Sequence, residues 1–221
     1  MHYGPIVISL LVATCHTCPA TPQAWLDIQQ TRWDVATIPE RHKPAVDKVA
    51  RRVERHKARY EAVADDTGVP WYVIAALHNM ESSGSFRRHL HEGSPLTRRT
   101  RWVPKGRPKH GSPPFTWEES AQDALQYDRM DRIDWDSLRH ALYGTERYNG
   151  TGYLRYHPET PSQYNWSKTS VARAGKYIAD GKFSRTAWSA QVGVAALWKT
   201  LGVYDPKPEP KKKGFWAWLF G

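Results

Sequence analysis

A single glutamate at the end of an apolar helical pattern is the residue of this chain best suited to chemistry. The apolar residues of the stretch 70–84 recur at spacings of three and four, which predicts one buried helical face: Val73, Ile74, Leu77 and Met80. Glu81 ends this pattern and is the only carboxylate between Asp66 and Glu92. Burial would raise the pKa of its carboxyl group, as a general acid requires. A glutamate in the last turn of a helix is also commonly a solvated surface residue, so both interpretations stand at this point.

The histidines and cysteines give weak signals for a metal or redox site. His89 and His91 would share one side of a strand, and His78 lies on the predicted helix, but no firm third ligand accompanies them. Cys15 and Cys18 have the spacing of a redox pair or half a zinc site, yet no second pair follows. We therefore expect no metal and no cofactor. Substrate hydrogen bonding or core packing explains the histidines more simply.

Composition points to an anionic partner. The 221 residues carry a net charge of +10, which suits nucleic acid, anionic lipid or the carboxylate-rich bacterial wall. Eleven Trp and eleven Tyr stand against five Phe, and such amphipathic rings favour surfaces that bind sugars or lie at interfaces. The chain is long enough for one good core with some length left for tails.

Several spaced segments resemble the lysozyme-like superfamily, which includes goose-type lysozymes and lytic transglycosylases. The first are Glu81-Ser82 at the end of an apolar helix, then Phe86, then Tyr148-Asn149-Gly150. A longer match, from Trp71 to Leu201, resembles phage and bacterial lysozyme-like proteins. Its segments are 89–97, 106–109, 113–121, 146–153 and 175–183. The resemblance implies cleavage of the MurNAc-GlcNAc β-1,4 bond of peptidoglycan, with Glu81 as general acid and base.

The resemblance also implies where substrate binds. In lytic transglycosylases the comparable Tyr-Asn segment lies across the cleft from the glutamate and hydrogen-bonds the sugar. The residues expected to contact substrate are His91, Glu92, Tyr148, Asn149, Tyr153 and Trp166. We expect peptidoglycan glycan strands as the partner, no nucleic acid, and a monomer. A non-catalytic wall-binding protein, or a chitinase or chitosanase on the same fold, remains an alternative.

The reaction type depends on a second carboxylate. Hydrolysis of a glycoside normally uses two carboxyl groups, whereas a lytic transglycosylase manages with one. Relatives often carry Asp where this chain has Ser94. Glu92 is two residues away and Asp180 is a more distant candidate. The departure at Ser94 mildly favours a single-acid mechanism over an inverting hydrolase.

We expect a mainly α, lysozyme-like α+β fold, with helices over 44–65, 70–82, 116–130, 134–144, 167–178 and 184–201. A small β-hairpin across 97–106 should line the sugar cleft, and this segment belongs to the most basic loop of the chain. Thr116 and Glu119 have the spacing of a capping box. Three regions are expected: an extended or loosely helical lead-in over 1–43, the catalytic domain over 44–203, and a tail over 204–221.

The two ends of the chain contain possible signals for where the protein is located in or outside the cell. The apolar run 5–15 predicts either an export or lipoprotein signal or an ordinary N-terminal segment. The C-terminal region alternates Pro and Lys and ends in a Trp-rich stretch, which suits either peripheral contact with an anionic membrane or docking on its own domain. We expect the protein in the cell envelope or periplasm, or secreted; a phage-encoded enzyme acting on the host wall fits equally.

Overall fold

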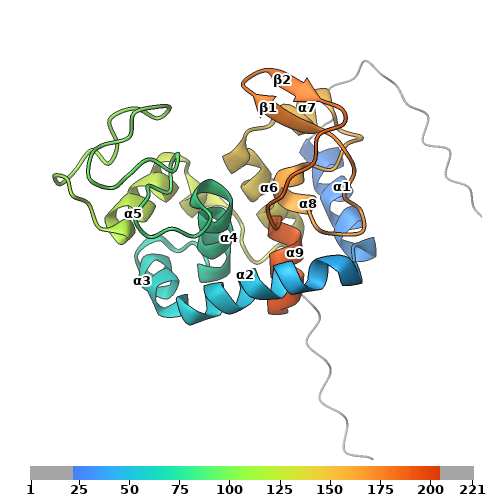
Figure 1. The fold of residues 1–221 in the computed structure, drawn as a ribbon, viewed down its shortest axis with the longest axis horizontal. Coiled ribbons are helices and arrows are strands. Elements are labelled where there is room, and N and C mark those ends of the chain that lie inside the picture. The colour runs from blue at the N-terminus through green and yellow to red at the C-terminus, as the bar shows by residue number, and fades with distance from the viewer. Residues whose placement is uncertain (1–21, 205–221) are drawn as a thin grey trace, which may run out of the picture.

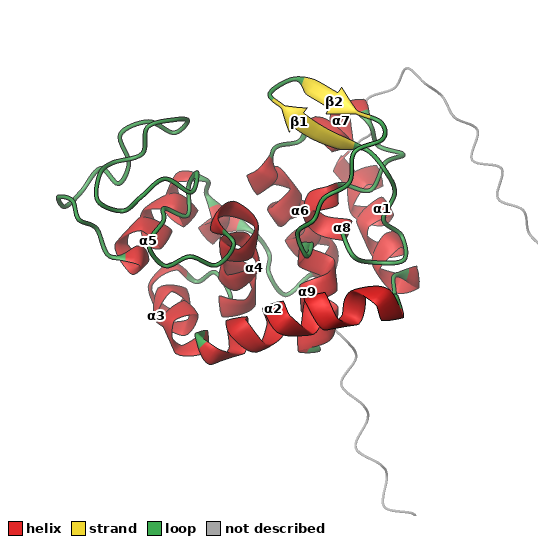
Figure 2. Ribbon diagram, in the orientation of Figure 1, coloured by secondary structure: helices red, strands yellow, loops and turns green. Residues whose placement is uncertain are grey.

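Helices dominate the part of the chain that the computed structural model describes, residues 22–204 (Figures 1 and 2). The α-helices are α1 Pro22–Val35, α2 Lys43–Arg55, α3 Lys57–Thr67, α4 Trp71–Ser82, α5 Trp117–Tyr127, α6 Leu138–Asn149, α7 Gly152–Tyr156, α8 Gln163–Trp166 and α9 Val194–Leu201. Two short 3₁₀ helices, Glu40–His42 and Met130–Arg132, and one antiparallel pair, β1 Lys176–Ala179 with β2 Lys182–Ser184, complete the fold. This content of helices confirms the predicted mainly α class. Within these residues no helix is long and apolar enough to span a membrane.

Helix α4 forms the centre of the fold. It packs against α3 on one side and α9 on the other, while α2 runs along one edge of the molecule beneath them (Figure 1). Val73, Ile74 and Leu77 are fully buried, as the apolar spacing predicts. Pro70 precedes the first turn and Ser83 ends the helix with a φ of 55°. The predicted helix over 70–82 is confirmed, and Glu81 occupies its last turn.

Helix α5 begins at the predicted capping box. The Thr116 hydroxyl accepts the backbone N–H of Glu119, and the Glu119 carboxylate accepts the backbone N–H of Thr116. Two N–H groups that lack a partner within the helix are thereby satisfied. Glu119 thus caps the N-terminus of α5, as its spacing from Thr116 predicts.

The single helix predicted over 44–65 is wrong in one respect. The chain forms α2 and α3 with a break at His56, whose backbone leaves the helical region at φ −106°, ψ 14°. The buried face nevertheless continues through both helices, because Val53 and Tyr60 are each about 1% exposed. The break bends the chain so that α3 can reach both α4 and α5.

The packed body extends beyond the residues 44–203 expected for the catalytic domain. Residues 22–35 form a regular helix instead of the extended or loosely helical course predicted for 19–44. Helix α1 packs against α6, and Trp33 is only 4% exposed. At the other end, Tyr204 packs edge-on against Trp33 and Tyr72. Residues 1–21 and 205–221, which include the predicted signal segment, both cysteines and the Trp-rich tail, lie outside the described residues.

The small sheet is not where the sequence predicted it. Residues 97–106 form an irregular loop, closed where Thr100 N–H donates to the Arg107 carbonyl at 2.8 Å. The hairpin instead occupies 176–184. The helix predicted over 167–178 is wrong, because residues 167–175 form turns and irregular structure and 176–179 form a strand. Asp180-Gly181 forms its two-residue turn, with Gly181 at a φ of 64°. An Asp-Gly pair is a strong hairpin signal, and it outweighed the weak helical pattern before it.

Other helix boundaries also differ from prediction: α5 ends at Tyr127 rather than at 130, and α6 begins at Leu138 rather than at 134. Helix α6 runs past Gly144 to Asn149, although Gly144 was expected to end it. A Cβ on Gly144 would lie 3.1 Å from an Ile133 side-chain carbon and 3.2 Å from the Trp135 ring, so the glycine allows close packing rather than a stop. Helix α9 begins only at Val194, ten residues later than predicted, and residues 185–193 form neither helix nor strand.

Candidate active site

A pocket of about 760 Å³ lies between the end of α4, helices α6 to α8 and the β-hairpin. We call it the main pocket; the residues that define it here are Met80, Asn149, Tyr153, Tyr164, Tyr177 and Gln191. Its volume falls within the range typical of small-molecule sites. Aromatic rings line much of it, as expected of a surface that packs against sugar rings.

Glu81 adjoins the α4 end of the main pocket: the neighbouring Met80 and the hydrogen-bond partner Tyr164 line the pocket, whereas Glu81 itself is not among the lining residues. The Tyr164 hydroxyl, which lines the pocket, donates a hydrogen bond of 2.9 Å to Glu81 Oε1. Gln191 Nε2 donates to the carbonyl of the adjacent Met80 at 2.7 Å and so ties the pocket wall to the same turn of α4. The carboxyl group is therefore held in place at the point where the buried helix meets the pocket.

Burial changes the acidity of Glu81. Desolvation raises the pKa of Glu81 to about 7, the Tyr164 hydrogen bond opposes this rise, and the negative charge of Asp128 adds to it. A carboxyl group with this pKa holds its proton through a large part of the neutral range. It can therefore give up a proton to a leaving group and later accept one.

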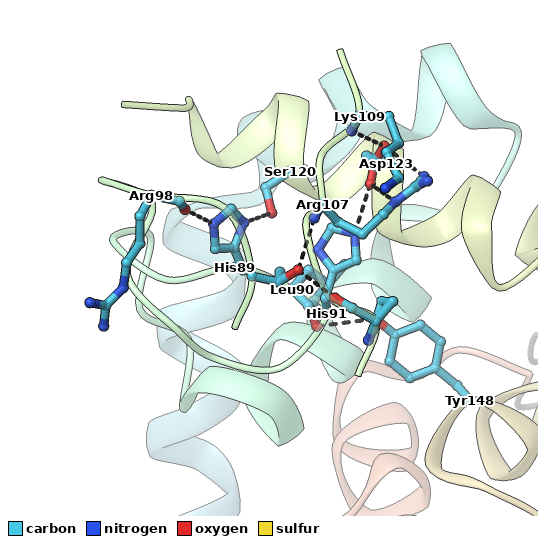
Figure 3. Close-up of polar contacts among 11 residues, drawn as sticks. His89, Leu90, His91, Arg98, Arg107, Lys109, Ser120, Asp123 and Tyr148 are labelled. Carbon is cyan, nitrogen blue, oxygen red and sulfur yellow. Dashed lines mark hydrogen bonds and ion pairs between the residues drawn. The ribbon is translucent and has the colours of Figure 1, made fainter. Parts of the chain in front are cut away.

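Tyr148 and Asn149 lie in the last turn of α6. The Tyr148 hydroxyl donates to the Leu90 carbonyl at 3.1 Å (Figure 3). Burial raises the pKa of Tyr148 well above its usual value, and the nearby charge of Glu81 raises it further. Tyr148 is thus close enough to Glu81 to feel its charge. Asn149 is exposed and lines the main pocket.

Tyr153 and Trp166 have different positions. Tyr153 lines the main pocket, its hydroxyl donates to the Gly175 carbonyl at 3.3 Å, and its ring meets Tyr177 edge-on. Trp166 is fully buried, and its indole N–H donates to Gln29 Oε1 at 3.0 Å. The expectation that Trp166 contacts substrate is wrong for this structure, because its ring belongs to the core between α8 and α1.

His91 supports the basic loop, residues 97–109, rather than the main pocket. Its Nε2 lies 2.9 Å from Asp123 Oδ2, and Arg107 donates two hydrogen bonds of 2.7 Å to the same carboxylate (Figure 3). Burial lowers the pKa of His91 to about 4 despite the Asp123 contact, so the ring is neutral at pH 7. His91 does not line the main pocket, and its role as a substrate contact is not supported.

His89 and Glu92 also serve the loop. His89 lies between the Ser120 hydroxyl at 2.8 Å and the Arg98 carbonyl at 2.7 Å (Figure 3). The Glu92 carboxylate accepts the backbone N–H groups of Arg101 at 3.1 Å and Trp102 at 2.9 Å. These contacts turn Glu92 toward the loop and disfavour it as a second catalytic acid. Among residues 22–204 no cluster of three or more His, Cys, Asp or Glu side chains could hold a metal ion.

Two further carboxyl groups with raised pKa values were not predicted, and one of them, Asp128, interacts with Glu81. Asp128 follows α5, and burial raises the pKa of Asp128 to about 6. Glu146 is 1% exposed, and burial raises its pKa to about 7. Its position four residues after the buried Leu142 was a signal that it faces inward. Asp128 had no comparable signal, because its burial depends on the path of the chain after α5.

Glu146 supports the helix that carries Tyr164. The Ser162 hydroxyl donates to Glu146, and the same Ser162 oxygen caps α8 by accepting the backbone N–H of Asn165 at 3.2 Å. Asn165 in turn donates to the Leu142 carbonyl at 2.8 Å. These contacts fix a four-residue helix too short to be stable alone. The position of the Tyr164 hydroxyl on Glu81 therefore depends on this buried network.

No family model, curated protein or solved structure matches this chain. Its candidate function therefore rests on the chemistry around Glu81 and on the segments that resemble the lysozyme-like superfamily. Two of those segments, the end of α4 and the Tyr148-Asn149 turn of α6, come together at the main pocket.

Proposed function

We propose that the protein cleaves the MurNAc-GlcNAc β-1,4 bond of peptidoglycan, with Glu81 as its single acid and base. The observation that supports this proposal most is the state of Glu81: a carboxyl group with a pKa of about 7, hydrogen-bonded to Tyr164, which lines an aromatic pocket beside it. The resemblance to lytic transglycosylases and goose-type lysozymes supports the same substrate. The enzyme acts as a monomer on glycan strands at the cell envelope or after secretion, whether for a bacterium or for a phage.

In the proposed reaction protonated Glu81 gives its proton to the glycosidic oxygen as the bond to the anomeric carbon breaks. Positive charge then develops on the sugar, and the Glu81 carboxylate that remains stabilises it. Glu81 next takes the proton from the C6 hydroxyl of the same MurNAc as that oxygen closes an anhydro ring. The proton count balances without water, and Glu81 returns to its starting state.

The surroundings of Glu81 favour this single-acid route over hydrolysis. Glu92 is occupied by two backbone N–H groups of the basic loop. Asp180 lines the main pocket but lies exposed in the hairpin turn. Asp128 influences Glu81 electrostatically and is the remaining candidate for a group that orients water. A hydrolytic reaction would leave a reducing MurNAc end and would make Asp128 its second carboxylate.

The test is release of soluble fragments from purified peptidoglycan by the wild-type protein, Glu81→Gln and Glu92→Gln. Glu81→Gln keeps the shape of the side chain but removes the proton donor, so release should fall by at least about a hundredfold. Glu92→Gln is the matched control and should retain most of the activity. No release by the wild-type protein, with binding to wall unchanged in both variants, would instead favour a non-catalytic wall-binding protein. Equal activity on chitin would favour the chitinase alternative.

A further inference from the structure

A second pocket, of about 320 Å³, lies beside the N-terminal end of α2. We call it the basic pocket; its lining includes Arg41, His42, Lys168, Ser170 and Trp188. It is formed by the 3₁₀ helix 40–42, the segment 167–172 that follows α8, and residues 188 and 189. Nothing in the proposed reaction at Glu81 uses these side chains.

The charge in the basic pocket is of one sign and is not compensated. No carboxylate lines it. Among the described residues Arg41 and Lys168 form no ion pair, while the neighbouring Glu40 carboxylate is bound by Lys43 at 2.5 Å. Desolvation lowers the pKa of His42, and the positive charges of Lys168 and Arg41 lower it further. Two unpaired cations facing one hollow favour the entry of an anion.

Two uncharged polar side chains of the basic pocket, His42 and Ser170, can donate hydrogen bonds to a ligand. Arg41 Nε donates to His42 Nε2 at 3.3 Å, so a neutral His42 carries its proton on Nδ1 and can donate from there. The Ser170 hydroxyl accepts the backbone N–H of Thr37 at 2.9 Å, which leaves its own proton free to donate. Oxyanions such as phosphate and carboxylate accept hydrogen bonds from donors of these kinds.

The walls of the basic pocket are held in place before any ligand arrives. Ser170 N–H donates to the Thr37 carbonyl at 2.8 Å, which makes a second bond between these two residues. The Ser167 hydroxyl donates to the Gln191 carbonyl at 2.8 Å and joins the segment after α8 to the strip before α9. A site whose walls are already ordered loses less entropy when a ligand binds.

Trp188 adds a flat surface at the same site. It lines the basic pocket with 59% of its surface exposed, which is unusual for so large an apolar ring. Exposed indoles beside polar donors suit sugar rings, which present one apolar face. The volume of about 320 Å³ is large enough for one ring with its charged group, near the lower limit of ligand sites.

We infer that the basic pocket binds an oxyanion carried on a sugar ring, with Arg41, Lys168 and Ser170 at the anion and Trp188 against the ring. The anion is a phosphate or a carboxylate, as found in acidic wall polymers. The inference does not depend on catalysis by Glu81. Ser189 lines both pockets, so the two sites adjoin each other.

The test is an NMR titration of the full chain with glucose 6-phosphate, glucuronate and glucose. Comparing glucose 6-phosphate with glucuronate shows whether the pocket prefers a phosphate or a carboxylate. Glucose shows how much the uncharged sugar ring alone contributes to binding. We expect saturable shifts for at least one charged sugar at the backbone amides of 41–42 and 168–170 and at the Trp188 indole N–H. Glucose should give no comparable shift.

Matched variants decide whether the pocket or overall charge is responsible. Arg41→Gln and Lys168→Gln should each weaken binding by about tenfold, the value of one hydrogen bond to a charged group. Arg51→Gln and Lys48→Gln, exposed positions on α2 outside the pocket, remove the same charge and should leave affinity unchanged. Glu81→Gln should also leave it unchanged. Absence of saturable shifts, or equal weakening in the control variants, would overturn the inference.

Discussion

Tyr164→Phe tests the link between the main pocket and the acidity of Glu81. The change removes the hydroxyl that donates to Glu81 Oε1 at 2.9 Å and keeps the buried ring. This bond favours the charged carboxylate and opposes the rise in pKa caused by burial. A hydrogen bond to a charged group contributes about 1.5 to 3 kcal/mol, and 1.36 kcal/mol corresponds to one pH unit. The pKa of Glu81 should therefore rise from about 7 by roughly 1 to 2 pH units.

The direct assay is an NMR titration of the glutamate side-chain carboxyl carbons, assigned with Glu81→Gln. Because the proposed acid must be protonated, activity on peptidoglycan should fall as the pH rises through the pKa of Glu81. In Tyr164→Phe this loss should move to higher pH by the same amount as the titration. The maximal rate should also fall, because the carboxyl group loses the contact that orients it.

Tyr148→Phe is the matched control for this experiment. Its hydroxyl donates to the Leu90 carbonyl and not to Glu81, and its ring lies near the same carboxyl group. The pKa of Glu81 should change little in this variant. If Tyr164→Phe leaves the pKa of Glu81 unchanged or lowers it, or if both variants shift it equally, the inferred role of Tyr164 is wrong.

Three further changes probe the surroundings of Glu81. Asp128→Asn removes a neighbouring negative charge, so the pKa of Glu81 should fall; the same carboxyl titration measures it, and a rise would contradict the reasoning. Gly93→Ala forces a side chain on a residue with a φ of 75° and places its Cβ 2.9 Å from the Glu81 carbonyl oxygen. In urea unfolding the free energy of unfolding should fall by about 1 to 3 kcal/mol relative to the wild-type protein. An unchanged urea concentration at the midpoint would refute the close contact. Glu146 has a folded-state pKa of about 7 against an ordinary 4.5, so its stabilising contribution is complete below pH 4.5 and is lost as the pH rises to 7. In Glu146→Gln the free energy of unfolding should therefore change by about 3 kcal/mol less between pH 4.5 and 7 than in the wild-type protein. If the free energy of unfolding varies with pH equally in both proteins, Glu146 is not buried as described.

The elements around Glu81 could be predicted because their signals are local. The apolar spacing of Val73, Ile74 and Leu77 depends only on helical geometry, and the burial of that face follows from it. The capping box at Thr116 likewise needs only residues three apart. Both predictions hold because the tertiary structure reinforces what the local sequence favours.

The remainder of the site depends on contacts between distant segments. Trp166 and Tyr164 are two residues apart on the same short helix, yet one ring faces Gln29 in the core and the other faces Glu81. Composition alone could not separate a buried tryptophan from one that contacts sugar. The rise in the pKa of Glu81 also includes the charge of Asp128, which lies 47 positions later in the chain.

The position of the hairpin was predictable in principle. Asp180-Gly181 is a short-range turn signal, whereas the Pro and Gly residues of 97–106 exclude a helix without specifying strands. The loop instead depends on Asp123, which binds both Arg107 and His91. This arrangement joins α5 to a segment 16 and 32 residues earlier, a contact that no local pattern reveals.

The central claim is that Glu81 alone supplies the proton transfers of glycan cleavage. Mass spectrometry of fragments released from purified peptidoglycan tests it most directly, with the wild-type protein and Glu81→Gln compared at the same concentration. The wild-type protein should release muropeptides one water lighter than the hydrolysis products, each ending in anhydro-MurNAc, and Glu81→Gln should release almost none. Reducing MurNAc ends would contradict the single-acid route, and equal release by both proteins would contradict the role of Glu81.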